Sequence, residues 1–141
     1  MLFLSIHPEF ARAIVDGRKT VELRKRRPSA PIGSGVVIYA TTPQCQVVAT
    51  ATLAKIEVAS PRLLWKSVSR IASVSKTKFD LYFHESELGV GLHLEKIQVF
   101  SEPLSLQELR QAWQEFQPPQ QFRYLDIRQQ KLIVAQDCRS I

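Results

Sequence analysis

The sequence predicts an α+β fold in which a small mixed β-sheet curls into a barrel and helices pack against its outside. Three observations support this class. Segments of strand type outnumber segments of helix type, most links between strands are too short for parallel crossovers, and 141 residues favour one domain, spanning residues 1–141, with one core. Hydrophobic residues make up 45% of the chain, as in ordinary globular proteins.

The chain begins with a short apolar run, LFLSI at residues 2–6, that predicts a buried strand. Pro8 suits the first position of a helix, and the apolar residues that follow recur at helical spacing. Gly17 suits the C-terminal cap of that helix. We therefore expect a helix over residues 8–16, directly before the most basic part of the chain.

The segment TVELRKR, which begins at Thr20, alternates in a way typical of a strand with one apolar and one polar face. Val21 and Leu23 lie on the apolar face. Thr20, Glu22 and Arg24 lie on the polar face.

Two further strands are expected after a turn-rich loop at residues 28–35. Residues 36–42 are β-branched and predict a strand covered on both faces. Residues 46–59 predict one long strand, or two strands joined by a bulge.

A pair of helices should follow, because Ser60 is a good N-cap and Pro61 suits the first helical position. The second helix of the pair is expected within residues 77–87. The first helix also carries a basic stripe at Arg62, Lys66 and Arg70, which either extends a binding surface or is an ordinary solvated face.

The last third of the chain predicts a strand over residues 89–100, from its alternating pattern. Ser105 and Glu108 have the spacing of a capping box and predict a helix after them. Residues 118–126 are expected to be irregular. Residues 128–136 fit a strand and a helix equally well.

Positive charge is concentrated near the N-terminus. Seven basic and two acidic residues lie between Arg12 and Arg27, so this segment carries nearly the whole net charge of +6. Such a patch on a neutral body indicates a polyanionic partner, although a merely soluble basic surface is the alternative.

The residues from Lys19 to Arg24 offer a possible site within that basic segment. Glu22 and Arg24 share one strand face, where an arginine can hold a carboxylate, and Lys19 and Thr20 stand beside them. If this face lines a cavity, the cations can take phosphate and Glu22 can accept a proton or a base amine. If it faces solvent, it is an ordinary exposed strand.

Other chemistries have little support. The dispersed histidines have no metal-ligand spacing, no Gly-rich phosphate loop occurs, and no cofactor is expected. No apolar run is long enough for a membrane span, and the N-terminus lacks the basic start of a secretion signal. Cys45 and Cys138 stand far apart, which favours a reducing, cytoplasmic setting. The aromatic residues that can stack on bases are Tyr39, Trp65, Tyr82, Phe122 and Tyr124, of which we expect Trp65 and Tyr82 to lie in the core.

Residues 17–24, GRKTVELR, fit the pattern G-x-K-x-x-E-x-R through Gly17, Lys19, Glu22 and Arg24. With the strand and helix before this motif, VVIYATTP after it and PPQQFRYL further on, the chain resembles the ASCH domain family of the PUA-like superfamily over most of its length. The resemblance implies a small PUA-like β-barrel whose cleft beside the first helix is lined by the motif residues. It also implies RNA or a nucleotide-like ligand as the partner, and a regulatory role is compatible with that.

We expect the ligand to be bound by Arg18, Lys19, Thr20, Glu22, Arg24, Lys25, Arg26 and Arg27. Some family members resemble single-strand ribonucleases in which the motif Lys is implicated. By that resemblance, Lys19 would stabilise charge developing at phosphorus, and Glu22 or Tyr39 would move protons. Another branch hydrolyses acetylated cytidine with a Lys and a Thr, but this chain carries Glu22 at the place of that Thr, and Thr20 lies one strand step away. Whether the protein is an enzyme therefore stays open at this point.

Overall fold

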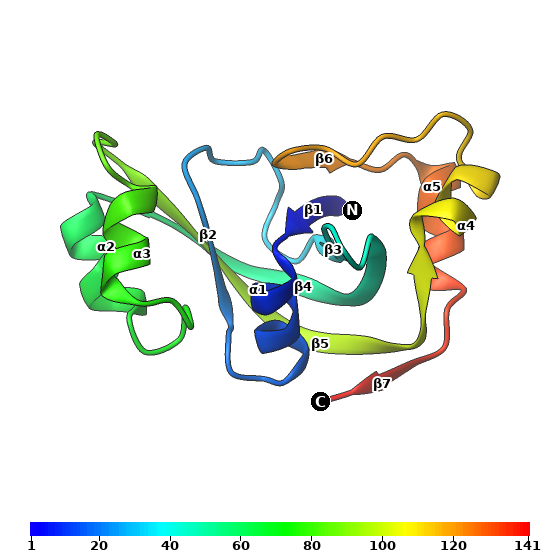
Figure 1. Ribbon diagram of the computed structural model, residues 1–141, viewed down its shortest axis with the longest axis horizontal. Coiled ribbons are helices and arrows are strands. Elements are labelled where there is room, and N and C mark those ends of the chain that lie inside the picture. Colours follow the sequence, from blue (N-terminus) through cyan, green and yellow to red (C-terminus); the bar gives the residue numbers. More distant parts are fainter.

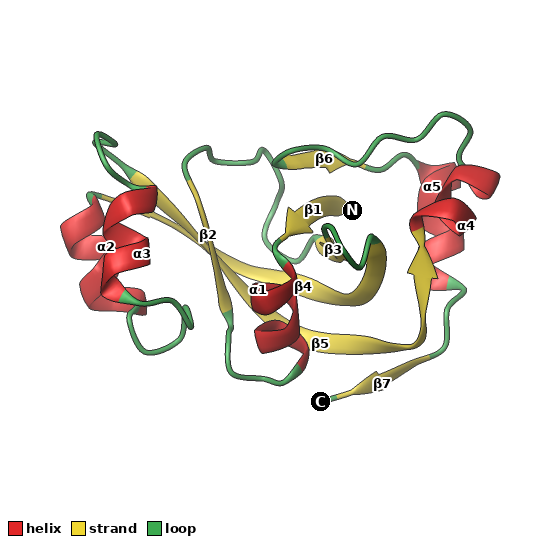
Figure 2. Ribbon diagram, in the orientation of Figure 1, coloured by secondary structure: helices red, strands yellow, loops and turns green.

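The computed structural model describes residues 1–141 and confirms the expected class, a mixed α+β fold with a curled sheet (Figures 1 and 2). The strands are β1 (Leu2–Ile6), β2 (Val21–Arg24), β3 (Gly35–Ala40), β4 (Gln46–Ala59), β5 (Gly89–Ser105), β6 (Phe122–Tyr124) and β7 (Cys138–Ser140). The helices are α1 (Pro8–Val15), α2 (Pro61–Val68), α3 (Lys76–Tyr82), α4 (Leu106–Ala112) and α5 (Ile127–Val134).

The sheet is a half-barrel with the strand order β2-β5-β4-β3-β1-β6, and β7 pairs separately with β5. Only β1 and β3 run parallel, and every other pair is antiparallel. Among the antiparallel pairs, β3 and β4 are joined directly by a short link. The two ends of this path, β2 and β6, are not paired with each other. The curl therefore leaves a seam between β2 on one side and β1 with β6 on the other.

Alternate side chains of the sheet pack into two separate cores, one on each face. Leu2, Leu4 and Ile38 belong to the cluster that α1 covers with Ala11 and Ile14. The residues between them in sequence, such as Phe3, Val37 and Tyr39, join a second cluster with Leu109 and Trp113 from the α4 side. Burial on both faces explains why β1 and β3 are apolar throughout.

A third, smaller core lies at one end of the molecule, where α2 and α3 pack on β2 and the ends of β4 and β5 (Figure 1). We call residues 60–83 the helical arm. Its core includes Leu64, Val68, Phe79 and Phe83. Ser60 caps α2 as expected, and Ser75 caps α3 in the same way.

The turn after α1 determines where the basic segment goes. The amide of Arg18 donates to the carbonyl of Ala13 (2.9 Å) and that of Gly17 to Ile14 (3.1 Å), which is the Schellman arrangement. Gly17 has a φ of 81°, as expected for a capping glycine. The amide of Lys19 then also bonds to Ala13 (3.0 Å), so the chain folds back under the helix before β2 begins.

The C-terminal part differs from the sequence-based expectation in three places. Strand β5 continues to Ser105, because Leu104 is buried opposite Val47. The exposed residues 101–103 interrupt the alternation there and hide the continuation. The ambiguous segment 128–136 lies largely in helix α5, which begins with a capping box at Asp126. Residues 118–126, expected to be irregular, contain strand β6. Strands β6 and β7 have three residues each and are too short for a detectable period.

No helix of the structure combines the length and the apolar character needed to cross a membrane.

Candidate functional site: a buried cation–carboxylate–cation row

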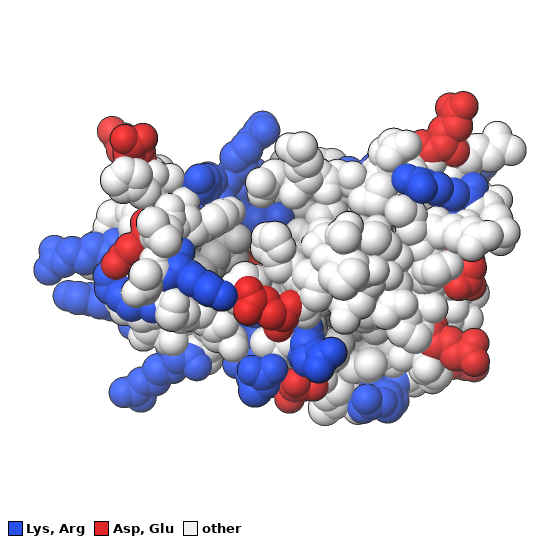
Figure 3. Space-filling model, viewed as in Figure 1, with Lys and Arg blue, Asp and Glu red and all other residues white.

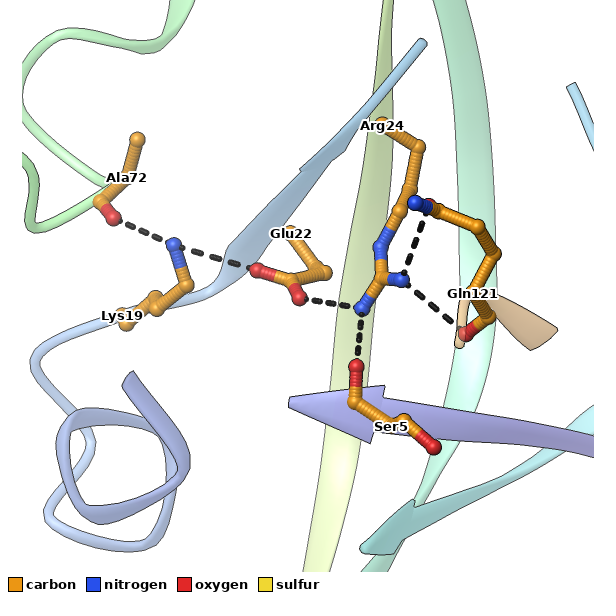
Figure 4. Close-up of polar contacts among 6 residues, drawn as sticks. All are labelled: Ser5, Lys19, Glu22, Arg24, Ala72 and Gln121. Atoms are coloured by element: carbon orange, nitrogen blue, oxygen red, sulfur yellow. Dashed lines mark hydrogen bonds and ion pairs between the residues drawn. The ribbon is translucent and has the colours of Figure 1, made fainter. Parts of the chain in front are cut away.

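Lys19, Glu22 and Arg24 lie side by side in the structure (Figure 4). The Lys19 Nζ is 3.4 Å from one carboxylate oxygen of Glu22, and the Arg24 Nη2 is 2.6 Å from the other. The three residues are only 2%, 6% and 5% exposed. This strand face is therefore withdrawn from water, which excludes the solvated-face alternative.

Arg24 bridges the seam of the half-barrel. Its Nη2 donates to the carbonyl of Ser5 in β1 (2.8 Å), and its Nη1 donates to the carbonyl of Gln121 just before β6 (3.0 Å). The Gln121 side-chain oxygen lies 3.4 Å from the same Nη1. The planar guanidinium thus supplies the polar contacts that strand pairing does not make there.

Lys19 connects the row to the helical arm. Its Nζ donates to the carbonyl of Ala72 (2.5 Å) and lies 4.8 Å from the centre of the Phe10 ring. Burial lowers the pKa of Lys19 below its ordinary value, and the nearby Arg24 lowers it further, while Glu22 raises it in part. Lys19 is therefore easier to deprotonate than a surface lysine.

Two buried cations around one carboxylate leave an excess positive charge in a place of low dielectric. Such a row is costly to bury, so its presence points to a role other than stability. Two atoms nearby add to this cost, because Ser5 Oγ and Arg24 Nε are buried without a hydrogen-bond partner.

A cavity of about 340 Å³ opens above this row, in the size range of ligand sites. It is enclosed by β1, α1, β2, α3 and the segment before β6. Its lining residues are Ser5, Ile6, His7, Glu9, Phe10, Lys19, Glu22, Leu23, Arg24, Val74, Lys78, Phe79, Tyr82, Gln120 and Gln121. The cavity therefore has an aromatic and aliphatic wall and a charged floor.

The remaining residues expected to bind ligand lie outside the cavity. Arg18, Lys25, Arg26 and Arg27 are exposed, and Thr20 is half-buried. Lys25 is the nearest of them to the cavity lining, since its Nζ lies 5.0 Å from the centre of the Tyr82 ring. The exposed cations therefore lie outside the cavity, with Lys25 next to Tyr82 of its wall.

Tyr39 is not brought to the cavity. Its ring packs in the second core, 5.4 Å from the centre of the Phe3 ring, and only 2% of the residue is exposed. Burial and a hydrogen bond with Cys45 raise its pKa well above the ordinary value. A phenol held there has no path to a ligand above Lys19, so we leave Tyr39 out of the site.

Several cavity residues escaped the sequence analysis. Tyr82, expected in the core, is half-buried and lines the cavity, and burial is the main reason for its raised pKa. Ser5 and Gln121 come from other elements, and no local sequence pattern marks them. The cation-rich neighbourhood of an amphipathic helix was the only available signal for Phe10.

No group of three His, Cys, Asp or Glu side chains is placed to hold a metal ion. Figure 3 shows that most Lys and Arg side chains of the viewed face lie over α1 and the helical arm, around the position of the cavity. In the right half of this face the centre is uncharged, and Asp and Glu side chains with a few Lys and Arg side chains lie along its edge.

Comparisons with known proteins agree with this architecture. The ASCH domain model matches residues 4–131. An "ASCH domain-containing ribonuclease" from Zymomonas mobilis is 36% identical over 132 residues, which cover 94% of this chain and 88% of that protein. The crystal structure of ASCH from Zymomonas mobilis superposes with a TM-score of 0.91 at 34% identity, over 96% of this chain and 95% of that chain. The N-terminal domain of Staphylothermus marinus McrB shares the fold alone, with a TM-score of 0.63, 10% identity, and coverage of 95% and 92%.

Proposed function

The chain belongs to the ASCH domain family, and from that premise we propose that it binds RNA or a nucleotide-like ligand in the cavity above Lys19, Glu22 and Arg24. The observation that carries the proposal is the burial of two cations around a single carboxylate in the floor of an open cavity. An anionic ligand would offset the excess positive charge that the row leaves there.

The walls of the cavity suit the rest of a nucleotide. Phe10 and Tyr82 offer aromatic surface for a base, and aromatic stacking binds bases of any sequence. Gln120 and Gln121 offer amide groups at the edge. The exposed residues Arg18, Lys25, Arg26 and Arg27 would attract the phosphate backbone, so binding would weaken as salt concentration rises.

Binding can be tested by fluorescence anisotropy with a labelled single-stranded RNA over a salt series. Wild type should bind with a negative salt dependence, and Lys19→Met should weaken binding by about tenfold, the loss of one charged hydrogen bond. Lys66→Met, on the exposed face of α2, is the matched control and should bind as wild type does. Absence of binding at low salt would refute the proposal.

Cleavage of single-stranded RNA is a second candidate function, favoured by the relative whose name includes ribonuclease and by the lowered pKa of Lys19. A lysine that is more easily deprotonated can exchange a proton with a ribose hydroxyl or a leaving oxygen more readily than a surface lysine, and its charged form stabilises a phosphorane. Glu22, hydrogen-bonded to Arg24, would hold Lys19 in position and is the second group available for proton transfer.

Incubation of end-labelled single-stranded RNA with purified protein tests this candidate. Wild type should produce fragments and Lys19→Ala should not, while retaining its folded circular dichroism spectrum. Equal cleavage by both proteins would identify a contaminant. Binding without cleavage would leave the first function alone, with a regulatory role.

The setting we propose is the cytoplasm, with residues 1–141 acting as one PUA-like domain. Both cysteines are unpaired in the structure, which agrees with a reducing compartment. The hydrolysis of acetylated cytidine is not proposed, because Glu22 is engaged by two cations and replaces the Thr that such chemistry uses.

A further inference from the structure

A second hollow, of about 450 Å³, lies beside the cavity on the other side of Phe10. We call it the α1 groove. Its lining residues are Pro8, Glu9, Phe10, Arg12, Arg18, Gln44 and Ser73. Glu9 and Phe10 line both hollows, so the α1 groove continues from the cavity past the first turn of α1.

The α1 groove has the chemistry of an anion site. It presents two guanidinium groups, one amide and one hydroxyl, and Arg12 and Arg18 are both exposed. Guanidinium groups match phosphate oxygens in charge and geometry. The acid in the lining is Glu9, which is paired with Lys78 of α3 at 3.2 Å, so its charge is already offset.

We infer that the α1 groove is a phosphate subsite for a second nucleotide, so that the ligand is a single-stranded polynucleotide extending from the cavity past Phe10 to Arg12 and Arg18, rather than a free mononucleotide. This inference rests on the proposed function and adds the length and the direction of the ligand. Phe10 separates the two hollows, and an aromatic ring between two phosphate positions is where a base of a single strand stacks.

One neighbour competes with the ligand in the α1 groove. Asp16 accepts a hydrogen bond from the Arg18 guanidinium at 3.1 Å, with roughly half of each side chain exposed. Exposed pairs of this kind contribute little free energy, so a phosphate can replace the carboxylate. Removing the carboxylate should therefore strengthen binding, an effect opposite in sign to the loss of an arginine.

The test uses a labelled oligouridylate of about ten residues, a length within the site sizes of small barrel domains. The double variant Arg12→Gln/Arg18→Gln should weaken binding by about tenfold or more. It should also reduce the slope of log K against log salt by about 1.4, since each phosphate contact on a single strand contributes about 0.7. Asp16→Asn should tighten binding several-fold. Wild type should prefer the oligouridylate to uridine monophosphate, and the double variant should lose most of that preference.

Arg62→Gln/Lys66→Gln is the matched control, because it removes the same charge from the exposed face of α2, outside both hollows. It should change affinity far less than the groove variant does. Equal losses in the two double variants would overturn the inference and indicate a diffuse basic surface, while the proposed function would stand. A wild type that binds no oligouridylate would overturn both.

Discussion

At the scale of single residues, Glu22 decides whether the site is stable. Its two carboxylate oxygens contact different cations, Lys19 and Arg24, and none of the three side chains has more than 8% of its surface exposed. Without this carboxylate, an ammonium and a guanidinium would face each other across a cavity floor that water barely reaches.

Replacement of Glu22 by Ala should therefore lower the free energy of unfolding by about 3 kcal/mol, as expected when one partner of a buried ion pair is removed. Glu22→Gln keeps the shape of the side chain and one acceptor, so its free energy of unfolding should fall by less. Urea unfolding of the three proteins measures both changes. A loss of less than about 1 kcal/mol for Glu22→Ala would mean that water or a counterion already screens the row.

Lys19 should make stability depend on pH in the alkaline range. Its pKa is lower in the folded protein than the ordinary 10.5 that applies after unfolding, so between these two values the unfolded chain binds more protons. The contribution of Lys19 to the free energy of unfolding therefore rises with pH across that window.

Urea unfolding at several pH values tests this sign. The difference in stability between wild type and Lys19→Met should shift in favour of wild type as pH increases from neutral to about 10. Lys66 is exposed, so the difference in stability between wild type and Lys66→Met should not change with pH. A difference that shifts the other way would mean that Glu22 outweighs desolvation and that the pKa of Lys19 is raised.

Some residues of the site could be predicted from the sequence alone, and others could not. Lys19, Glu22 and Arg24 could be found because two-residue spacing in a strand places side chains on one face. Ser5, Tyr82 and Gln121 could not, because each meets Arg24 or the cavity through contacts that span tens of residues. Tyr39 was expected to move protons on the basis of the family resemblance, but it faces the second core.

At the scale of elements, the helical arm depends on one close approach. An added Cβ at Gly89 would lie 2.8 Å from Leu64 and 2.9 Å from Phe83, both buried in the arm core. At Gly91, two residues along β5, the nearest atoms would be 3.4 Å away. Of these two glycines, only Gly89 therefore leaves no room for a methyl group.

Gly89→Ala should destabilise the protein by about 1–2 kcal/mol through overpacking, while Gly91→Ala should cost less. Thermal unfolding compares the two variants. Because α3 supplies Tyr82 and Lys78 to the cavity, Gly89→Ala should also weaken RNA binding more than Gly91→Ala does. Equal effects of the two substitutions would show that the arm core repacks freely.

The elements were largely predictable where a pattern runs over two or more turns or pleats. Helices α1, α2 and α4 were found from caps and apolar spacing. In the structure Gly17 caps the end of α1, and Ser60 and Ser105 cap the starts of α2 and α4. Strands β6 and β7 were not, because three residues carry no period and their pairing partners β1 and β5 lie far away in sequence.

At the scale of the whole molecule, the half-barrel is completed by a side chain instead of a strand pair. Short links between strands predicted the curl, but no sequence pattern indicates whether the last strands of a curl pair with each other. Here β2 and β6 do not pair, and Arg24 spans from β2 to Ser5 and Gln121.

Arg24→Met should loosen this seam without unfolding the sheet. The amide of Ser5 donates to the Gln121 carbonyl (3.3 Å), which also accepts a hydrogen bond from Arg24, so it should exchange its hydrogen faster. The amide of Ile38, in the middle of the sheet, should keep its protection. Hydrogen exchange followed by NMR measures the exchange rates of both amides. Equal acceleration of the two would indicate global destabilisation instead.

Besides the Phe10 ring, two oxygen atoms contact the Lys19 ammonium. An ammonium has three N–H donors, and Ala72 and Glu22 occupy two of them. A neutral amine has two donors and one lone pair, so Lys19 satisfies the same two partners in either protonation state. The third position alone changes, from a donor to an acceptor. A proton can therefore leave without breaking either contact to oxygen, but its departure removes the charge that faces Glu22 and the Phe10 ring.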